Sequence, residues 1–206
     1  MNKYFIYVGG IVAAIIGALL FQQVSKVPEP EHALYYQQPR SLKAFELTDH
    51  NGQSFKKEQL EGQWSFAFLG YTSCPDVCPT TLQNLGFIYD DLKAIANNTQ
   101  ILLISADPQR DTQDKLNQYI NYFNPEFIAL RADHGVLFPF ARNLGLMYAI
   151  NGEGEDYLID HSASLILINP NGNITAIFKP EQAIGEVPTI DSDKLLSDYE
   201  KIVALY

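Results

Sequence analysis

The chain contains two cysteines, Cys74 and Cys78, which are separated by three residues and surrounded by Pro75, Asp76 and Pro79. Residues four apart on a helical turn point the same way, so both sulfur atoms can meet one metal ion or each other. The spacing is one residue longer than the Cys-x-x-Cys of common redox dithiols, and two cysteines cannot supply a four-cysteine zinc framework. The proline and aspartate neighbours indicate an exposed, functional turn. A structural disulfide or a pair of buried thiols is the alternative interpretation.

His161, one of four histidines, is the second candidate for chemistry. We expect it to begin a strand, directly after an acidic, glycine-rich loop at residues 151–156 and beside Asp160. A single histidine is more often a structural residue than a metal ligand, and position alone slightly favours that interpretation. The other three are expected at the surface, in a linker, a turn and the start of a helix: His32, His50 and His134.

The cysteines lie where a predicted strand turns into a predicted helix. Residues 64–69 form a short apolar and aromatic run typical of a buried strand, and apolar residues recur at helical spacing up to about residue 97. Pro79 suits the first helical position, because the N–H that proline lacks has no partner there. Cys78 would then lie at the helix N-terminus, where the partial positive charge favours a thiolate.

A second buried strand is predicted at residues 100–105, parallel to the first because a helix links them. The segment 107–112 follows it and should face the same side of the sheet as the cysteines. Upstream, the Asn51-Gly52 turn predicts a hairpin. Downstream, strands and helices alternate and end in a hairpin and a last helix, which predicts a mixed α/β sandwich of thioredoxin type. Such proteins normally carry a cis-proline before the strand of His161, and its absence here leaves space for a third ligand.

The N-terminal segment differs in composition from the rest of the 206-residue chain. It predicts a cytoplasmic N-terminus at residues 1–3, an uncleaved transmembrane anchor at 4–24 and a proline-punctuated linker at 25–40, before the folded domain at 41–206. A cleaved signal peptide is the alternative, but no small-x-small site follows the apolar run. The net charge of −10 and the absence of a basic cluster exclude nucleic acid as the expected partner.

Three motifs together resemble the Sco (SenC) family: FLGYTSCPDVCP at residues 68–79, DPQRDT at 107–112 and YLIDHS at 157–162. Members of that family are membrane-anchored, thioredoxin-fold copper chaperones that assemble the Cu(A) centre of cytochrome c oxidase. The resemblance extends from about Ala44 to the C-terminus. It implies a bacterial inner-membrane protein with a periplasmic domain. The implied partners are the oxidase subunit that carries Cu(A), and another copper chaperone or a thioredoxin-like reductant.

The resemblance also implies that Cys74, Cys78 and His161 bind a copper ion. Thiolates suit Cu(I), an added imidazole lets the site hold Cu(II), and three ligands leave a position open for transfer. Zinc could occupy the same ligands. We expect Asp160 to orient His161 or to shape its loop, as outer carboxylates of metal sites do. Asp107 resembles the acidic residue that the family carries near the site, which implies a role in partner docking or redox tuning.

Two functions of different classes follow from these residues. The first is copper transfer to the oxidase by a protein that is not an enzyme. The second is a thiol–disulfide reductase in which Cys74 and Cys78 are a redox-active pair that keeps the copper-site cysteines of the oxidase reduced. His161 discriminates between them, because a reductase has no evident need of it. A peroxidase is a weaker interpretation, since Tyr71 stands where peroxiredoxins have threonine.

Overall fold

The structure is a computed structural model that describes residues 3–24, 27–152, 154, 157–181 and 187–206. Its centre is an eight-stranded mixed sheet with the order β1-β10-β9-β4-β5-β6-β2-β3, and a separate two-stranded sheet pairs β7 with β8. The strands are β1 (Leu34–Ser41), β2 (Glu46–Asp49), β3 (Ser54–Lys56), β4 (Trp64–Gly70), β5 (Thr99–Ser105), β6 (Ile128–Arg131), β7 (Tyr148–Asn151), β8 (Leu158–His161), β9 (Leu165–Ile168) and β10 (Asn173–Phe178). The helices are α1 (Lys3–Val24), α2 (Val77–Phe87), α3 (Tyr89–Ile95), α4 (Gln113–Phe123), α5 (His134–Leu144) and α6 (Ser192–Leu205), with a short 3-10 turn at Lys57–Gln59.

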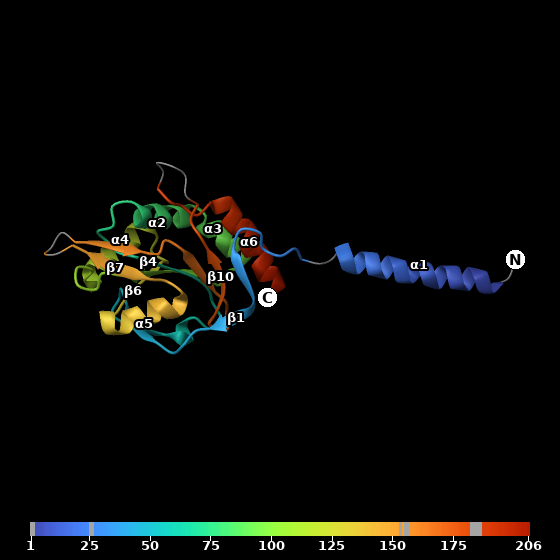
Figure 1. Ribbon diagram of the computed structural model, residues 1–206, viewed down its shortest axis with the longest axis horizontal. Helices are drawn as coiled ribbons and strands as arrows, with labels where there is room; N and C mark the ends of the chain where they lie inside the picture. Colours follow the sequence, from blue (N-terminus) through green and yellow to red (C-terminus); the bar gives the residue numbers. More distant parts are fainter. Residues whose placement is uncertain (1–2, 25–26, 153, 155–156, 182–186) are drawn as a thin grey trace.

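Strand β4 is buried along its whole length because both faces of the sheet are covered. Alternate residues point to opposite faces: Phe66 and Phe68 belong to one core cluster, and Ala67 and Leu69 to the other. Helices α2, α3, α4 and α6 contribute to the first cluster, and α5 to the second. In Figure 1, α2 and α3 lie above the sheet and α5 below it. The predicted α/β sandwich is therefore confirmed.

The parallel pair that presents the cysteine turn also forms as predicted. β4 pairs with β5 in parallel, in register from Trp64 opposite Thr99 to Gly70 opposite Ser105. The carboxyl ends of the two strands therefore meet at one edge, where Ala106 donates its amide hydrogen to the carbonyl of Gly70. The segments that follow the two strands, with the cysteines and with Asp107, begin side by side.

Several local expectations are wrong. The predicted helix to about residue 97 is interrupted at Ile88, whose backbone leaves helical geometry and separates α2 from α3. Pro79 is the third residue of α2, not the first, because the helix already begins at Val77. Residues 34–41, mostly within the expected linker, form β1, which pairs antiparallel with β10.

The histidine in the turn between β2 and β3 is not at the surface. His50 is only 6% exposed, and its Nδ1 accepts the amide hydrogen of Ala129 in β6 at 3.2 Å. The turn itself matches the prediction, with β2 and β3 antiparallel and Gly52 in the left-handed region at φ 81°.

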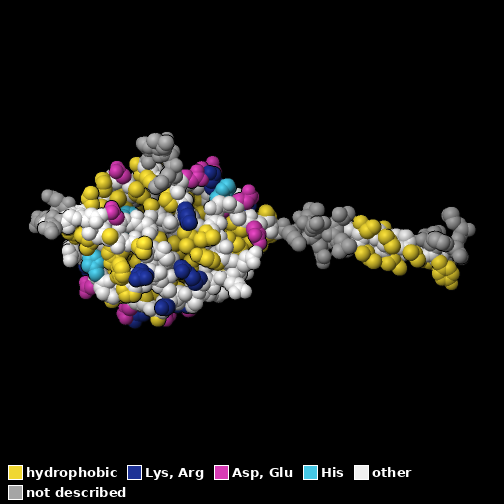
Figure 2. Space-filling model, viewed as in Figure 1, with side chains coloured by type: hydrophobic (Ala, Val, Ile, Leu, Met, Phe, Trp, Pro, Cys, Tyr) yellow, Lys and Arg dark blue, Asp and Glu magenta, His cyan; other side chains and the backbone are white. Residues whose placement is uncertain are grey.

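The expected anchor at residues 4–24 lies within α1, which stands apart from the sheet in Figure 1. Within the described residues, however, no helix combines the length and apolar character that crossing a bilayer requires. Figure 2 shows apolar side chains exposed along the described part of α1.

Candidate metal centre

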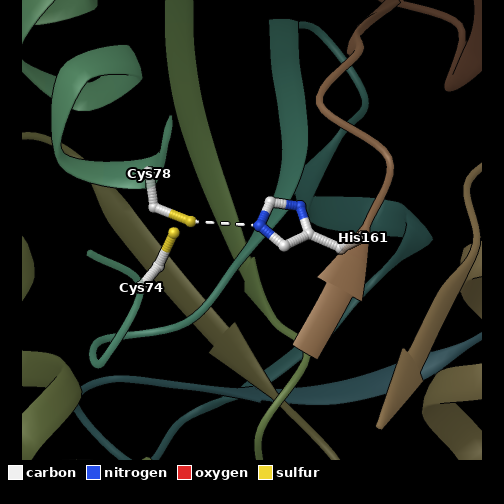
Figure 3. Close-up of side chains that lie close together, drawn as sticks. All are labelled: Cys74, Cys78 and His161. Atoms are coloured by element: carbon white, nitrogen blue, oxygen red, sulfur yellow. Dashed lines mark hydrogen bonds between the residues drawn. The ribbon is translucent and has the colours of Figure 1, made fainter. Parts of the chain in front are cut away.

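Three side chains from separate segments meet at the edge where β4 and β5 end. Cys78 lies in the first turn of α2, Cys74 in the loop before it, and His161 at the end of β8. Their ligand atoms all lie within 4.8 Å of one another, and Cys78 Sγ is 3.3 Å from His161 Nε2. Figure 3 shows both sulfur atoms and the imidazole pointing toward one another. The three residues predicted as copper ligands are thus brought together, although His161 ends its strand instead of beginning it.

The close approach of α2 to the sheet depends on Gly70, the last residue of β4. A Cβ at this position would lie 3.0 Å from Cys78 Sγ and 2.8 Å from Leu103 Cδ1. Both distances are too short for carbon in a packed interior. Glycine therefore lets the buried Cys78 sulfur lie directly against the strand end.

Asp111 fixes the loop that precedes Cys74. Its fully buried carboxylate accepts hydrogen bonds from the amide and the hydroxyl of Thr72, the latter at 2.5 Å, and from the hydroxyl of Ser105 at 2.6 Å. Asp111 is not the cap of the helix that follows, because Thr112 takes that role by accepting the amide hydrogen of Lys115. Sequence reasoning missed Asp111 because its partners are distant in the chain.

The two cysteines have different electrostatic environments. The hydrogen bond from Cys78 lowers the pKa of the half-exposed Cys74 thiol to about 4, with burial opposing the shift and His161 adding to it. The same hydrogen bond, together with burial and the nearby Cys74 charge, raises the pKa of Cys78. Cys74 is therefore the thiolate and Cys78 the thiol that donates to it. The expectation of a thiolate at Cys78 from the helix N-terminus alone is wrong, because that sulfur is buried and coupled to a more exposed partner.

The imidazole of His161 is held by a backbone group. Its Nδ1 lies 3.2 Å from the carbonyl oxygen of Ser162, and its ring stands edge-on to Tyr71 with centroids 6.0 Å apart. With the proton on Nε2, the ring donates to the Cys74 thiolate; with the proton on Nδ1, that nitrogen donates to the carbonyl and the Nε2 lone pair faces the sulfur atoms, which is the form that can bind a metal ion.

Asp160 does not orient this ring. Its side chain is exposed on the opposite face of β8, as expected for the neighbouring residue in a strand, and accepts a hydrogen bond from Asn151 of β7. The predicted role of Asp160 next to His161 therefore has no contact to support it among the described residues.

Asp107 lies near the centre but is connected to it indirectly, through the side chain of Tyr157. Its buried carboxylate accepts a hydrogen bond from Tyr157 Oη at 2.6 Å and forms an ion pair with Arg110. Burial alone would raise the pKa of Asp107, but the bonds from Tyr157 and Arg110 lower it overall. Arg110 also stacks on the Tyr157 ring at 3.7 Å, and Tyr157 packs in one apolar cluster with Tyr71 and Cys78. Asp107 thus secures the segment that enters β8.

An open cavity of about 240 Å³ lies over the centre. It exposes Cys74 and His161 to a molecule that approaches from solvent, whereas Cys78 forms no part of its lining. Asp76 and Asp160 are also among the residues that line it. The arrangement of two sulfur donors and one imidazole nitrogen around an accessible point is suited to holding a soft or borderline metal ion and to releasing it.

Comparison with known proteins agrees with this geometry. The protein-family model described as SCO1/SenC matches residues 35–190. A SCO2-like protein of Rickettsia typhi is 35% identical over 166 residues, which cover 79% of this chain and 82% of the relative. The structure of Arabidopsis thaliana ScoI with copper bound superimposes with a TM-score of 0.71 at 28% identity, covering 80% of this chain and 98% of that one. Bradyrhizobium japonicum ScoI, also solved with copper bound, gives 0.65 at 26% identity, covering 79% and 99%.

Proposed function

The chain belongs to the SCO1/SenC family, and from that premise we propose that it binds one copper ion as cargo through Cys74, Cys78 and His161. The observation that carries the proposal is the approach of all three ligand atoms to within 4.8 Å of one another, from segments more than eighty residues apart. Two relatives of the same fold have been solved with copper bound, which supports the choice of metal.

The residues fit copper in both oxidation states. The sulfur atoms of Cys74 and Cys78 are the soft donors that Cu(I) prefers, and the imidazole nitrogen of His161 suits Cu(II). Because Cys78 is a thiol in the metal-free protein, it must lose its proton when it binds the ion, so loading releases a proton. An incoming ligand can approach through the open cavity on the side of Cys74 and His161.

The test is an anaerobic titration of the reduced protein with Cu(I) and with Cu(II). We expect one equivalent to bind and Cu(II) to show a thiolate-to-copper absorption band. Replacing His161 by alanine should weaken Cu(II) binding by about 100-fold or more, since losing even an outer partner of a ligand costs 10–100-fold. His32→Ala is the matched control, because that side chain is exposed and only its backbone N–H is bonded. Binding that is indifferent to His161, or specific for Zn²⁺ over Cu(I), contradicts the proposal.

We extend the proposal to delivery of this copper to the Cu(A) site of cytochrome c oxidase, as the resemblance of the three motifs implies. The accessible cavity supports transfer, because a partner's ligand can reach the ion before the three protein ligands have left it. Copper-loaded protein mixed with the apo Cu(A)-bearing domain should yield the Cu(A) absorption spectrum. The His161→Ala variant, loaded at high copper, should yield less. Absence of transfer from the wild-type protein would restrict the proposal to copper binding.

Thiol–disulfide reduction is the second candidate, favoured by the opposite pKa shifts of the two cysteines. The Cys74 thiolate would attack a partner disulfide and release one partner thiolate. Cys78, after losing its proton, would then attack Cys74 Sγ, release the second partner thiolate and leave a Cys74–Cys78 disulfide. Two results together would favour this candidate over the first. The wild-type protein would bind copper weakly, and His161→Ala would reduce an oxidised Cu(A)-bearing domain as fast as the wild type does.

We also propose that residues 4–24 anchor the chain in the bacterial inner membrane, with the domain on the periplasmic side. The support is the uncharged run from Tyr4 to Phe21, with Lys3 before it. Full-length protein should sediment with membranes and resist alkaline extraction, whereas a chain that begins at residue 27 should not. Proteolysis of the domain in spheroplasts tests the side. Recovery of the full-length chain in the soluble fraction would exclude the anchor.

A further inference from the structure

The histidine of the metal centre lies on a hairpin that is separate from the main sheet. Within the described residues, β8, which ends at His161, pairs with β7 alone, and these two strands form their own two-stranded sheet. The eight-stranded sheet therefore does not fix the position of His161, whereas Cys78 is fixed by α2 and the core. The place of the imidazole relative to the sulfur atoms depends on whatever fastens this hairpin to the rest of the molecule.

Tyr148 is the residue of β7 that faces His161 directly. The two are Cα partners in the antiparallel register, so their side chains lie on the same face of the hairpin. The same end of the hairpin is closed by the amide of Ser162, which donates to the carbonyl of Met147 at 2.9 Å. A displacement of Tyr148 would therefore be passed to His161 through the adjoining backbone.

The side chain of Tyr148 is held by two residues of α5. Its hydroxyl lies 2.8 Å from His134 Nδ1, and its ring packs against the rings of His134 and Phe138, with centroids 5.7 and 5.9 Å apart. His134 and Phe138 are four residues apart and so share one face of the helix. Helix α5 is itself held firmly in the core, because four of its residues are fully or nearly fully buried: Leu137, Phe140, Ala141 and Leu144.

Tyr148 also connects two apolar clusters. It packs at the edge of the core cluster that contains α5, and at the edge of the small cluster formed by Tyr71, Cys78, Ala106, Tyr157 and Ile159. The other end of β8 is secured by Asp107 and Arg110 through Tyr157, at the opposite end from His161. At the His161 end of the hairpin, the His134–Tyr148 hydrogen bond ties β7 to α5, and the contact of His161 Nε2 with Cys78 Sγ reaches α2.

We propose that His134 and Tyr148 are positioning residues for His161: their hydrogen bond fastens β7 to α5 and thereby holds the imidazole within ligand distance of Cys74 and Cys78. Neither residue touches the ion; each acts through the hairpin. The consequence for copper rests on the proposed function, whereas the fastening of the hairpin is a property of the metal-free protein. Sequence reasoning had assigned His134 to the exposed start of a helix.

The metal-bound test compares Cu(II) affinity and spectrum in Tyr148→Phe and His134→Ala. Phenylalanine keeps the ring and removes only the hydroxyl. We expect the Cu(II) affinity of each variant to fall by about tenfold, which is the lower end of the effect of losing a residue that supports a metal ligand. The coupling to the imidazole nitrogen in the electron paramagnetic resonance spectrum should also change. The double variant should lose little more than either single variant, because both remove the same contact. His134→Asn, whose amide can replace Nδ1 as donor or acceptor, should restore most of the affinity.

Tyr122→Phe is the matched control for loss of a tyrosine hydroxyl, since Tyr122 is 84% exposed on α4. Unfolding by denaturant, measured on every variant, separates positioning from general destabilisation. A loss of stability in Tyr148→Phe with unchanged copper affinity and spectrum would overturn the proposal, as would additive effects in the double variant.

The metal-free test uses amide hydrogen exchange of the reduced protein. Tyr148→Phe and His134→Ala should speed exchange at Ser162 and in β7 and β8, while β4 and β5 exchange as in the wild type. If the amides of the hairpin exchange at the wild-type rate in both variants, the His134–Tyr148 contact does not hold the hairpin and the proposal is refuted. If the wild-type protein does not bind copper, the proposed function fails, yet this measurement still decides whether the two residues hold the hairpin in place.

Discussion

At the scale of single residues, the centre is defined by how differently its two sulfur atoms are placed. Cys78 is buried at the start of α2 and keeps its proton, and the hydrogen bond that it donates stabilises a thiolate at the more exposed Cys74. The pair thus carries one negative charge in the metal-free protein, on Cys74. Cys74 is the sulfur that an approaching ion or disulfide meets first, because it lines the open cavity.

This asymmetry predicts how fast each cysteine reacts with iodoacetamide. A thiol with a lowered pKa is deprotonated at every pH above that value, so Cys74 should react at a nearly constant rate from pH 8 down to about pH 5. Its rate should fall only as the pH approaches about 4. Cys78 should stay unmodified over this range. Site-resolved mass spectrometry gives both rates.

In Cys78→Ala, which removes the main cause of the shift, the midpoint for Cys74 should move up toward that of an ordinary thiol. A wild-type midpoint already in the ordinary range, or preferential labelling of Cys78, would contradict the assignment of the thiolate.

A second prediction at the scale of single residues concerns Gly70. In Gly70→Ala the new methyl group would press on Cys78 Sγ and Leu103 Cδ1, which both belong to buried side chains. We expect a loss of about 1–3 kcal/mol in unfolding free energy from overpacking, and weaker copper binding because the sulfur is displaced. The control is Gly135→Ala, a helical position where an added Cβ meets nothing within 4 Å. Wild-type copper affinity in Gly70→Ala would show that the close approach is not needed.

At the scale of elements, the first and last segments of the domain are joined by one buried carboxylate. Asp198 of α6 is fully buried and accepts hydrogen bonds from the backbone N–H groups of Glu31, His32 and Ala33, just before β1. Burial alone would raise the pKa of Asp198, but these hydrogen bonds lower it overall. The contact places β1 at the edge of the sheet, against β10.

A group whose pKa is lowered by folding stabilises the folded state above its unfolded pKa, and that contribution disappears as the pH falls through the folded value. Asp198→Ala should therefore cost about 3 kcal/mol at pH 7, because three backbone donors lose their acceptor. The difference in unfolding free energy between wild type and Asp198→Asn should shrink as the pH falls below about 4, because the carboxylate then takes up a proton in the unfolded chain, while in the folded protein its lowered pKa keeps it ionised to a lower pH. Unfolding by denaturant, followed from pH 7 to pH 3, measures this difference in unfolding free energy.

A constant difference between wild type and Asp198→Asn over this pH range would contradict the assignment. Asp193→Asn, in the exposed first turn of the same helix, is the control.

At the scale of the whole molecule, the sheet has a core cluster on each face, covered by helices, and the metal centre lies at one edge of the sheet. Helix α1 stands apart from this body in Figure 1, on the side of α6 and β1 and away from β7. The residues that tie the N-terminal side of the domain to α6 begin at Glu31. In the part of the chain that the structure describes, the core and the centre therefore show no contact with α1.

Removal of residues 1–26 should accordingly leave the unfolding free energy of the domain unchanged within about 0.5 kcal/mol, the usual range for changes away from packed features. Copper affinity should also be unchanged. Removal of residues 1–33 should destabilise the domain, because it deletes the partners of Asp198. Equal stability of the two truncated chains would show that the Asp198 contact contributes nothing.

The sequence by itself was sufficient for the order of most elements and for the three residues of the centre. The apolar run of β4, the parallel partner β5 and the caps of α4 and α6 follow from local pattern, because periodicity and capping depend on residues close together in the chain. Cys74, Cys78 and His161 were found because their types and spacing matched a known combination of motifs. The fold and family inferred from those motifs agree with the comparisons.

Only the tertiary structure decided how these residues are held. The burial of His50, the three hydrogen bonds of Asp111 and the pairing of His134 with Tyr148 join segments far apart in the sequence, where no local pattern reports them. Alternation along a strand places the neighbours Asp160 and His161 on opposite faces, but which of the two faces the sulfur atoms is decided only by how β8 packs against the rest of the protein. Which sulfur carries the charge likewise follows from burial and from the contact between Cys74 and Cys78. Both are properties of the packed chain rather than of the residue types.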